Sequence, residues 1–267
     1  MLPESRPLQP GTLCFMMADV DTSTERMHII HQKNHRFNHQ AMFIREPLLA
    51  LREQGVDVPQ FGGPWLADTC EDGCITVNMT RSPMDARDRE DYNRSETQMH
   101  RDALRLAGLL KEHVPEFAHA KIVSTAVMAG IRQSRRVKGI HVLNGEEYIH
   151  AVRFPDAVAR SSHAVDIHLS DGEGQVLSFP DDAGYIPFRC LINDTHRNLF
   201  FAGRAISADE DAFAATRVQV PCMETGQAAG LAASVCLLNG GVPVQETPVD
   251  KLLEKVHEYG SCIENNP

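Results

Sequence analysis

The sequence predicts an α+β protein in which a mixed sheet fills most of the chain. Short apolar runs typical of strands are scattered irregularly among a few helical segments. A different pattern closes the chain: between Asn198 and Ala233, an apolar run is followed by a loop and a helix packed with small residues. This strand, loop and helix predict a return to an α/β arrangement at the C-terminal end.

Composition and charge limit the kinds of protein that this chain can be. Its 267 residues, 42% hydrophobic, are enough for one large domain or two modest ones. The net charge of −10 argues against a general nucleic-acid binder, and no apolar run reaches the roughly 18 residues that a membrane span needs. The first 15 residues lack the pattern of a signal peptide, and the seven cysteines are scattered. We therefore expect a cytoplasmic protein with reduced thiols.

The N-terminal half contains two strand patterns, a loop and one clear helix. Residues 11–21 and 74–81 have the apolar density or alternation of strands, whereas Gly and Pro residues predict a loop over residues 58–66. A capping box formed by Ser95 with the Gln three residues later predicts the start of a helix, and Pro115 predicts its end.

The C-terminal half contains further strands and a capped helix. Residues 122–143 have apolar ends around a basic centre and predict a long strand or a strand pair. Residues 164–169 and 185–192 predict short strands. In the last helix, Thr247 is the expected N-cap and Gly260 the expected left-handed stop.

Four histidines fall on one face of a predicted helix, at steps of three, four and four residues: His28, His31, His35 and His39. A metal site is one interpretation, because imidazole binds zinc, copper or nickel. However, the stripe carries no carboxylate or cysteine to complete a ligand set. We therefore favour a solvated or interface helix and expect no metal.

The segment from Asn198 onward has the chemistry of a ligand-binding turn. Gly203 ends the apolar run and allows close backbone approach, and Pro221 suits the first turn of the helix that follows. The N–H groups of that helix start suit a phosphate or the pyrimidine edge of a flavin. A close-packed Ala/Gly helix without a ligand fits the same spacing equally well.

Four motifs, in order along the chain, resemble those of the FAD-dependent oxidoreductases with a glutathione-reductase-like FAD fold, a group related to the flavoprotein subunit of heterodisulfide reductase. They are Gly130–Arg136, Asp166–His168, Tyr185–Arg189, and the segment Ala202–Gly230 that contains Ala-Gly-Arg and Gly-Gln-Ala-Ala-Gly. The resemblance covers nearly the whole chain and is weakest between Ser23 and Cys74.

The resemblance implies FAD as the cofactor and a division of the chain by role. Residues 1–197 would form a substrate or cap domain, and residues 198–267 the C-terminal portion of the FAD-binding, Rossmann-like domain. The residues expected to bind the cofactor are Gly203, Arg204, Ser207, Arg217, Met223, Gly226 and Gln227.

The same resemblance implies a small-molecule substrate and candidate catalytic residues. These are His168, Arg132, Arg189 and Tyr185. Arginine can grip a carboxylate, a phosphate or a flavin carbonyl with two hydrogen bonds, and histidine can exchange a proton near neutral pH. The alternatives are surface salt bridges for the arginines and a hydrogen-bonded core position for His168.

The sequence departs from the family pattern in one respect. No Gly-x-Gly-x-x-Gly motif, which normally opens the nucleotide-binding half, occurs in these 267 residues. We therefore expect a split or truncated enzyme that acts with a separate nucleotide-binding chain, or as a homo-oligomer. The alternative is a non-catalytic scaffold subunit or a remnant of such an enzyme. No nucleic-acid or membrane partner is expected.

Overall fold

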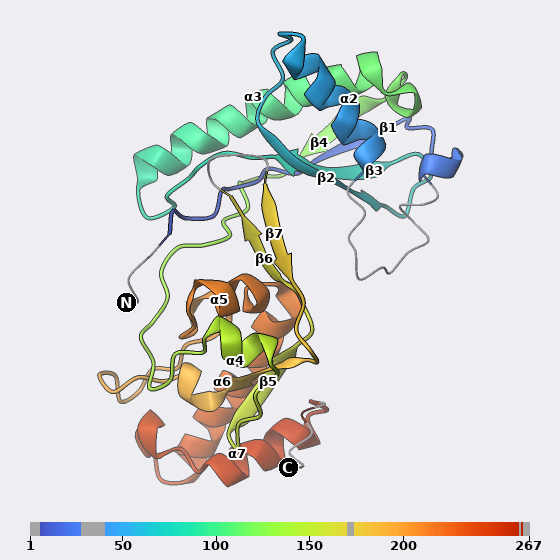
Figure 1. Ribbon diagram of the computed structural model, residues 1–267. Coiled ribbons are helices and arrows are strands. Elements are labelled where there is room, and N and C mark those ends of the chain that lie inside the picture. The colour runs from blue at the N-terminus through green and yellow to red at the C-terminus, as the bar shows by residue number, and fades with distance from the viewer. Residues whose placement is uncertain (1–5, 28–40, 170–173, 262, 264–267) are drawn as a thin grey trace. The chain divides into compact units, whose positions relative to one another are not determined.

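The computed structural model describes residues 6–27, 41–169, 174–261 and 263, so the predicted histidine stripe lies outside the described residues. The chain forms two compact units (Figure 1). The sheet unit comprises Leu8–Ser134 and His168–Gly174, and the helical unit comprises Met1–Pro7, Arg135–Ile167 and Gln175–Pro267. Small antiparallel sheets are mixed with helices, which confirms the α+β class. No helix in the described ranges has both the length and the apolar character to cross a bilayer.

The sheet unit is built on a four-stranded antiparallel sheet in the order β2-β3-β1-β4. The strands are β1 (Phe15–Ala18), β2 (Phe61–Asp68), β3 (Ile75–Thr80) and β4 (Lys121–Thr125). Phe15 pairs with Val77 on one side and with Thr125 on the other, so β1 is a central strand. Its buried residues Phe15 and Met17 alternate with half-buried ones and join one continuous core.

Helices α2 (Met42–Glu53) and α3 (Arg89–His113) lie against this sheet and touch each other (Figure 1). The helix α3 begins six residues before the predicted capping box, because the Asp88 side chain accepts hydrogen bonds from the backbone N–H groups of Glu90 and Asp91. Ser95 is instead a buried residue inside the helix, with its hydroxyl donating to the carbonyl of Pro83. The predicted end is confirmed: α3 stops before Pro115, which opens a short 3-10 turn, η1 (Pro115–Phe117).

The predicted loop at residues 58–66 is wrong, because most of it belongs to strand β2. The strand tolerates Gly62, Gly63 and Pro64 because it lies at the edge of the sheet, where an irregular register needs fewer ladder hydrogen bonds. The register shifts between Phe61 and Trp65, which spans the irregular part.

The helical unit packs helices around a two-stranded antiparallel pair, β5 with β8. Helix α6 lies against β5 and α7, and α4 lies against α5 and β8. The bounds are α4 (Gly145–Ile149), β5 (Ala157–Ser161), β8 (Gly184–Pro187), η2 (Phe188–Cys190), η3 (Gly203–Ala205), α5 (Glu210–Thr216), α6 (Gln219–Leu238), η4 (Val244–Glu246) and α7 (Val249–Glu258). The helix α4 starts with a complete capping box between Asn144 and Glu147.

Two strand predictions are wrong in this part of the chain. Within residues 122–143 only β4 is a strand, and the basic centre is irregular apart from a bridge at Gly130. Residues 199–202 form no strand and Asn198 lies in a turn; the Phe201 N–H donates to the Leu191 carbonyl. In α7, Thr247 bonds to the Val244 carbonyl and does not cap the helix, whereas the left-handed Gly260 is confirmed with φ of 83°.

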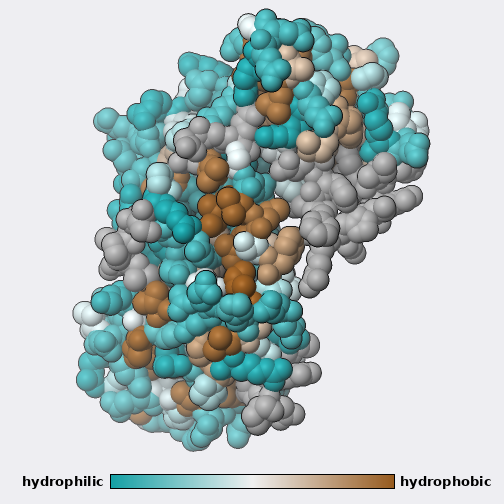
Figure 2. Space-filling view, in the orientation of Figure 1, coloured by the Kyte–Doolittle hydropathy of each residue, from teal (hydrophilic) through white to brown (hydrophobic). Residues whose placement is uncertain are grey.

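Strands β6 (Val165–His168) and β7 (Gln175–Ser178) form a separate two-stranded sheet. Three apolar side chains of this hairpin are well exposed, those of Leu169, Val176 and Leu177. Figure 2 shows apolar atoms gathered over this hairpin. Apolar patches of this kind are typical of surfaces that contact another molecule.

Candidate functional site

The turn at Gly203 and the start of α6 form one hydrogen-bonded assembly in the helical unit. Gly203 has a φ of 60°, in the left-handed region that favours glycine. Its N–H donates to the Thr225 hydroxyl over 3.0 Å, and that hydroxyl donates in turn to the Pro221 carbonyl over 2.7 Å. No side chain caps the start of α6. The first turn of this 20-residue helix therefore presents its N–H groups and partial positive charge beside the turn.

One face of α6 is open along its length. Met223 is 64% exposed, and a Cβ added to Gly226 or Gly230 would meet nothing within 4 Å. Gln227 also lies at the surface, with its amide nitrogen donating to the Tyr259 carbonyl over 3.3 Å. This helix is apolar all round, a composition typical of buried helices, yet a whole face is exposed.

Two arginines of the predicted cofactor set lie near each other at this turn. Arg217 is largely buried, and its Nη2 lies 3.0 Å from the Asp166 carbonyl oxygen and 3.3 Å from its carboxylate. Burial lowers the pKa of Arg217 in spite of that carboxylate, and the charge of Arg204 lowers it further. Arg204 itself is exposed. Positive charge is thus concentrated beside Gly203.

Ser207 is fully buried in the helical unit. Its backbone N–H donates to the Cys190 carbonyl, and its carbonyl accepts from Leu143. A Cβ at Gly139 would lie 2.8 Å from the Ser207 Cβ, so the chain around Gly139 packs directly over it. Within the described part of the chain, the Ser207 hydroxyl has no hydrogen-bond partner.

A cavity of about 610 Å³ adjoins the 198–205 segment. Phe201 and Ala205 line it together with two exposed cations, Arg135 and Lys138. Phe201 also stacks edge-on against His196, with ring centroids 6.2 Å apart. Asp194 lines the cavity as well, so the cavity combines an aromatic wall with three cationic side chains and one anionic side chain, a lining that suits a ligand with a flat apolar part and negative charge.

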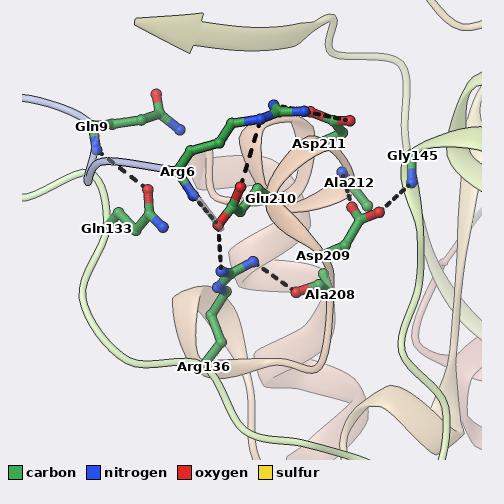
Figure 3. A network of polar contacts seen from close by, with 10 residues as sticks. All are labelled: Arg6, Gln9, Gln133, Arg136, Gly145, Ala208, Asp209, Glu210, Asp211 and Ala212. Atoms are coloured by element: carbon green, nitrogen blue, oxygen red, sulfur yellow. Dashed lines mark hydrogen bonds and ion pairs between the residues drawn. The ribbon is translucent and has the colours of Figure 1, made fainter. Parts of the chain in front are cut away.

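Arg136 also lines this cavity, but its guanidinium has partners typical of a structural role (Figure 3). It is 2% exposed, its Nη1 donates to the Ala208 carbonyl over 2.8 Å, and its guanidinium lies over the Phe213 ring. Glu210 lies between the guanidinium groups of Arg136 and Arg6, 3.9 Å from the former (Figure 3). Only Arg135 of this pair is exposed.

Two of the predicted catalytic residues, Arg189 and Tyr185, also belong to the helical unit. Arg189 forms a two-point ion pair with Asp156, at 2.9 Å from Nε and 3.2 Å from Nη2. The hydrogen bond to Asp156 raises the pKa of Arg189. Tyr185 is 3% exposed on β8, beneath the guanidinium of Arg153. Both residues have the partners of a structural role.

The other two predicted catalytic residues, His168 and Arg132, belong to the sheet unit. Arg132 donates from Nη1 to the Pro10 carbonyl and to the Thr12 hydroxyl. His168 is buried, and its Nδ1 lies 2.8 Å from Nη2 of Arg81. Arg81 was not among the predicted site residues. Its signal in the sequence is a charged residue at the end of the strand predicted over residues 74–81, because a buried arginine at a strand end is unusual.

The model of the family described as FAD dependent oxidoreductase matches residues 3–256. The chain belongs to this family. FAD is therefore the cofactor of this oxidoreductase, and the family accounts for an oxidoreductase activity. No curated protein and no solved structure is significantly similar to the chain.

The residues of the oxidoreductase fit an FAD group on the evidence of the helical unit itself. A left-handed glycine, an uncapped helix start, an exposed Arg204 and an open Gly226 lie along one stretch of chain. In contrast, no three histidine, cysteine or acidic side chains among the described residues are grouped as a metal site. The predicted cofactor residues Gly203, Arg204 and Arg217 come together, whereas the predicted catalytic residues are distributed over both units.

Proposed function

We propose that the helical unit of this oxidoreductase binds the flavin-ring side of FAD and that a separate chain supplies the nucleotide-binding half. The observation that carries the proposal is the Gly203 turn, which Thr225 joins to the uncapped start of α6 beside exposed Arg204. In a chain of this family, that assembly offers backbone N–H donors and a cation to the same ligand.

The proposed chemistry follows from the charge at this assembly. FAD supplies the capacity to accept two electrons from a substrate. The N–H groups of Gln219 and Val220 in the first turn of α6, together with the guanidinium of Arg204, would stabilise negative charge on a bound flavin. The open Gly226 gives clearance at the next turn, and exposed Met223 contributes an apolar contact.

The remaining candidates for a small-molecule substrate divide between the units. Arg132 and His168 are candidates within the sheet unit, and Arg189 and Tyr185 are candidates within the helical unit. Arg189 is the most available of these, since its side chain is 43% exposed while it holds Asp156, and a substrate carboxylate can take the place of that partner.

The exposed face of α6 supports a protein partner. Leu237 and Leu238 are 75% and 79% exposed, and Val220 is exposed at the other end of the helix. Residues 199–202 add a segment outside any strand, and we propose that it pairs with a strand of the partner. We assign this surface to a chain that carries the Gly-x-Gly-x-x-Gly motif, because that half of the family fold completes an FAD site and is not among these residues.

The test compares the chain alone with the chain co-expressed with a protein that carries the Gly-rich motif and is encoded beside it. Flavin is measured by visible absorbance, and assembly by sedimentation. We expect weak FAD binding and self-association for the chain alone, and stoichiometric FAD in the complex. Tight, stoichiometric FAD on the chain alone as a monomer would contradict the split enzyme, and FAD on a homodimer would assign the α6 face to a second copy.

A point variant locates the cofactor within the complex. Arg204→Ala should weaken FAD binding, while Arg197→Ala, which removes another exposed arginine of the helical unit, should leave it unchanged. Equal FAD affinity of the two variants would refute the assignment of the Gly203 turn. A complex that forms without flavin in any preparation would favour the non-catalytic scaffold.

A further inference from the structure

The cavity of about 610 Å³ that Phe201 lines, here called the Phe201 cavity, has walls that backbone hydrogen bonds join to each other. The Val137 N–H donates to the Ala205 carbonyl over 3.0 Å. The Ile140 N–H donates to the Ile192 carbonyl, also over 3.0 Å. The segment that contributes residues 135–139 is thus fixed against the two other segments of the lining.

The loop of residues 193–196, which lines the same cavity, is fixed as well. The side-chain oxygen of Asn193 accepts from the backbone N–H groups of Thr195 and His196, over 3.3 and 3.0 Å. The Gln245 side chain donates to the His196 carbonyl over 2.9 Å. These hydrogen bonds occupy backbone groups of the loop, so the cavity is formed before a ligand arrives, as is usual for small-molecule sites.

Two exposed cations of the Phe201 cavity, Arg135 and Lys138, have no hydrogen bond or ion pair from their side chains within the described part of the chain. The third cation of the lining differs, because Arg136 donates to the Ala208 carbonyl. The chain contains 36 acidic residues against 26 lysines and arginines, so acidic partners are abundant. Two cations without a partner in one cavity therefore indicate an anionic ligand from outside the chain.

The same cavity has an aromatic side. Phe201 is half-buried and meets the His196 ring edge-on, with an interplanar angle of 78°. Rings of this kind pack against flat ligands in stacked or edge-on contacts. Nδ1 of His196 lies 3.2 Å from the side-chain amide of Asn193, whereas Nε2 has no hydrogen-bond partner among the described residues. A flat ring with a negative group matches both sides of this lining.

We propose that the Phe201 cavity binds the small-molecule substrate, and that this substrate is a planar aromatic or heteroaromatic carboxylate. Its ring packs against Phe201 and His196. Its carboxylate binds the guanidinium of Arg135, whose planar shape matches two carboxylate oxygens, and Lys138 supplies a second positive charge.

Two further features of the lining define the ligand. Asp194 is the acidic residue among those that line the cavity, and its charge opposes a second negative group, so a monoanion is favoured over a dianion. Phe201 and Ala205 stand two residues before and two residues after Gly203, at the turn to which the flavin is assigned. The role of this ligand as the substrate rests on the proposed function, whereas its binding does not.

The experiment measures the binding of naphthoate to the purified full chain by titration calorimetry at neutral pH and low salt. Three related compounds are titrated beside it: naphthylmethanol, which has the ring without the charge; cyclohexanecarboxylate, which has the charge without an aromatic ring; and naphthalene dicarboxylate, which has two charges. We expect naphthoate to bind about tenfold more tightly than each of them. Equal affinity for naphthoate and any one of these compounds would overturn the assigned ligand class.

Variants of the lining test the assigned contacts. Arg135→Met and Lys138→Met should each weaken naphthoate binding by about three- to tenfold, because each removes a charged partner. Asp194→Asn should tighten it, because it removes negative charge from the lining. The matched control is Arg197→Met, which removes an exposed arginine of the same unit that does not line the cavity, and its affinity should be unchanged. Unchanged affinity in the two cavity variants, or an equal loss in Arg197→Met, would refute the proposal.

The same titration on the complex that holds FAD tests the role as substrate. We expect naphthoate to bind in the presence of FAD and to shift the visible absorption of the flavin. Competition between naphthoate and FAD would assign the cavity to the cofactor and overturn the substrate role. A chain that binds naphthoate, but whose complex never holds FAD, contradicts the proposed function alone. A complex that holds FAD and does not bind naphthoate contradicts this inference alone.

Discussion

Gly226→Val separates a cofactor role of α6 from a packing role. In the folded chain a Cβ at this position meets nothing within 4 Å, so the two γ-methyl groups extend from an open face. Glycine costs a helix interior about 1 kcal/mol relative to alanine, and valine costs roughly half as much. The variant should therefore stabilise the chain by about 0.5 kcal/mol, which is a rise of about 1–2 °C in Tm.

The same substitution should block FAD if the flavin lies at the start of α6. The assay has two parts: thermal unfolding of the chain alone, and flavin absorbance of the complex with the nucleotide-binding chain. Gly230→Val is the matched control, because its Cβ also meets nothing within 4 Å and it lies one turn further from the helix start. We expect both variants to be at least as stable as the unaltered chain, and we expect Gly226→Val to lose more flavin than Gly230→Val.

Two results would refute this reasoning. If Gly226→Val keeps full flavin and an unchanged reduction potential, the start of α6 does not bind the ring. If the variant loses more than about 1 kcal/mol of unfolding free energy, its effect on flavin is a folding effect. Flavin lost equally from Gly226→Val and Gly230→Val would move the assignment from the cofactor to the docking of the partner chain along the whole face.

Three further predictions concern the residues around this assembly. Asp166→Ala should cost about 3–5 kcal/mol in urea unfolding, because it removes a carboxylate partner of the buried Arg217; a loss below 1 kcal/mol would contradict the buried ion pair. Gly203→Ala should cost about 1–2 kcal/mol through its φ of 60° alone, since the new Cβ would lie 3.7 Å from the Cys222 sulfur; an unchanged Tm would rule out a left-handed residue there. Burial raises the pKa of Tyr148 from 10.0 to about 12, so its contribution to stability is complete below pH 10 and is lost as the pH rises to about 12; Tm should fall over that range, and an equal fall in Tyr148→Phe would contradict this.

Local patterns predicted helix ends better than helix starts. Pro115 cannot continue a helix, so the end of α3 follows from one residue. Its start was predicted at the Ser95 capping box, and this prediction was wrong because the helix begins after Asp88. Asp88 caps the helix, whereas the Ser95 hydroxyl donates to the Pro83 carbonyl. That hydrogen bond joins two separate segments, so the sequence around Ser95 does not reveal it. In β2, likewise, only the edge position shows why glycine and proline are accepted in a strand.

Within the candidate site, the special backbone position of Gly203 was predictable. Its place after an apolar run predicted a backbone that needs glycine, and its φ of 60° lies in the left-handed region that glycine adopts freely. The contact between Gly62 and Arg81 was not predictable. A Cβ on Gly62 would lie 1.9 Å from Nη2 of Arg81, and this proximity depends on the register of β2 on β3, which pairs Phe61 with Thr80. The strand predicted at residues 198–202 does not form, although the segment has the apolar composition of a strand. A strand also needs a neighbouring strand to pair with, and composition does not show whether one is present.

The contacts of Arg6 with Glu210 and Asp211 form late during synthesis of the chain. The sheet unit is nearly continuous in sequence, so residues 8–134 can fold while the ribosome is still making the rest. Arg6 must wait for Glu210 and Asp211, which lie 204 and 205 residues later, or roughly 10–40 s at ordinary elongation rates. The helical unit therefore completes its internal contacts only after most of the sheet unit has been synthesised. A nascent chain held at residue 205 should carry a protease-resistant sheet unit and a fully cleavable helical unit.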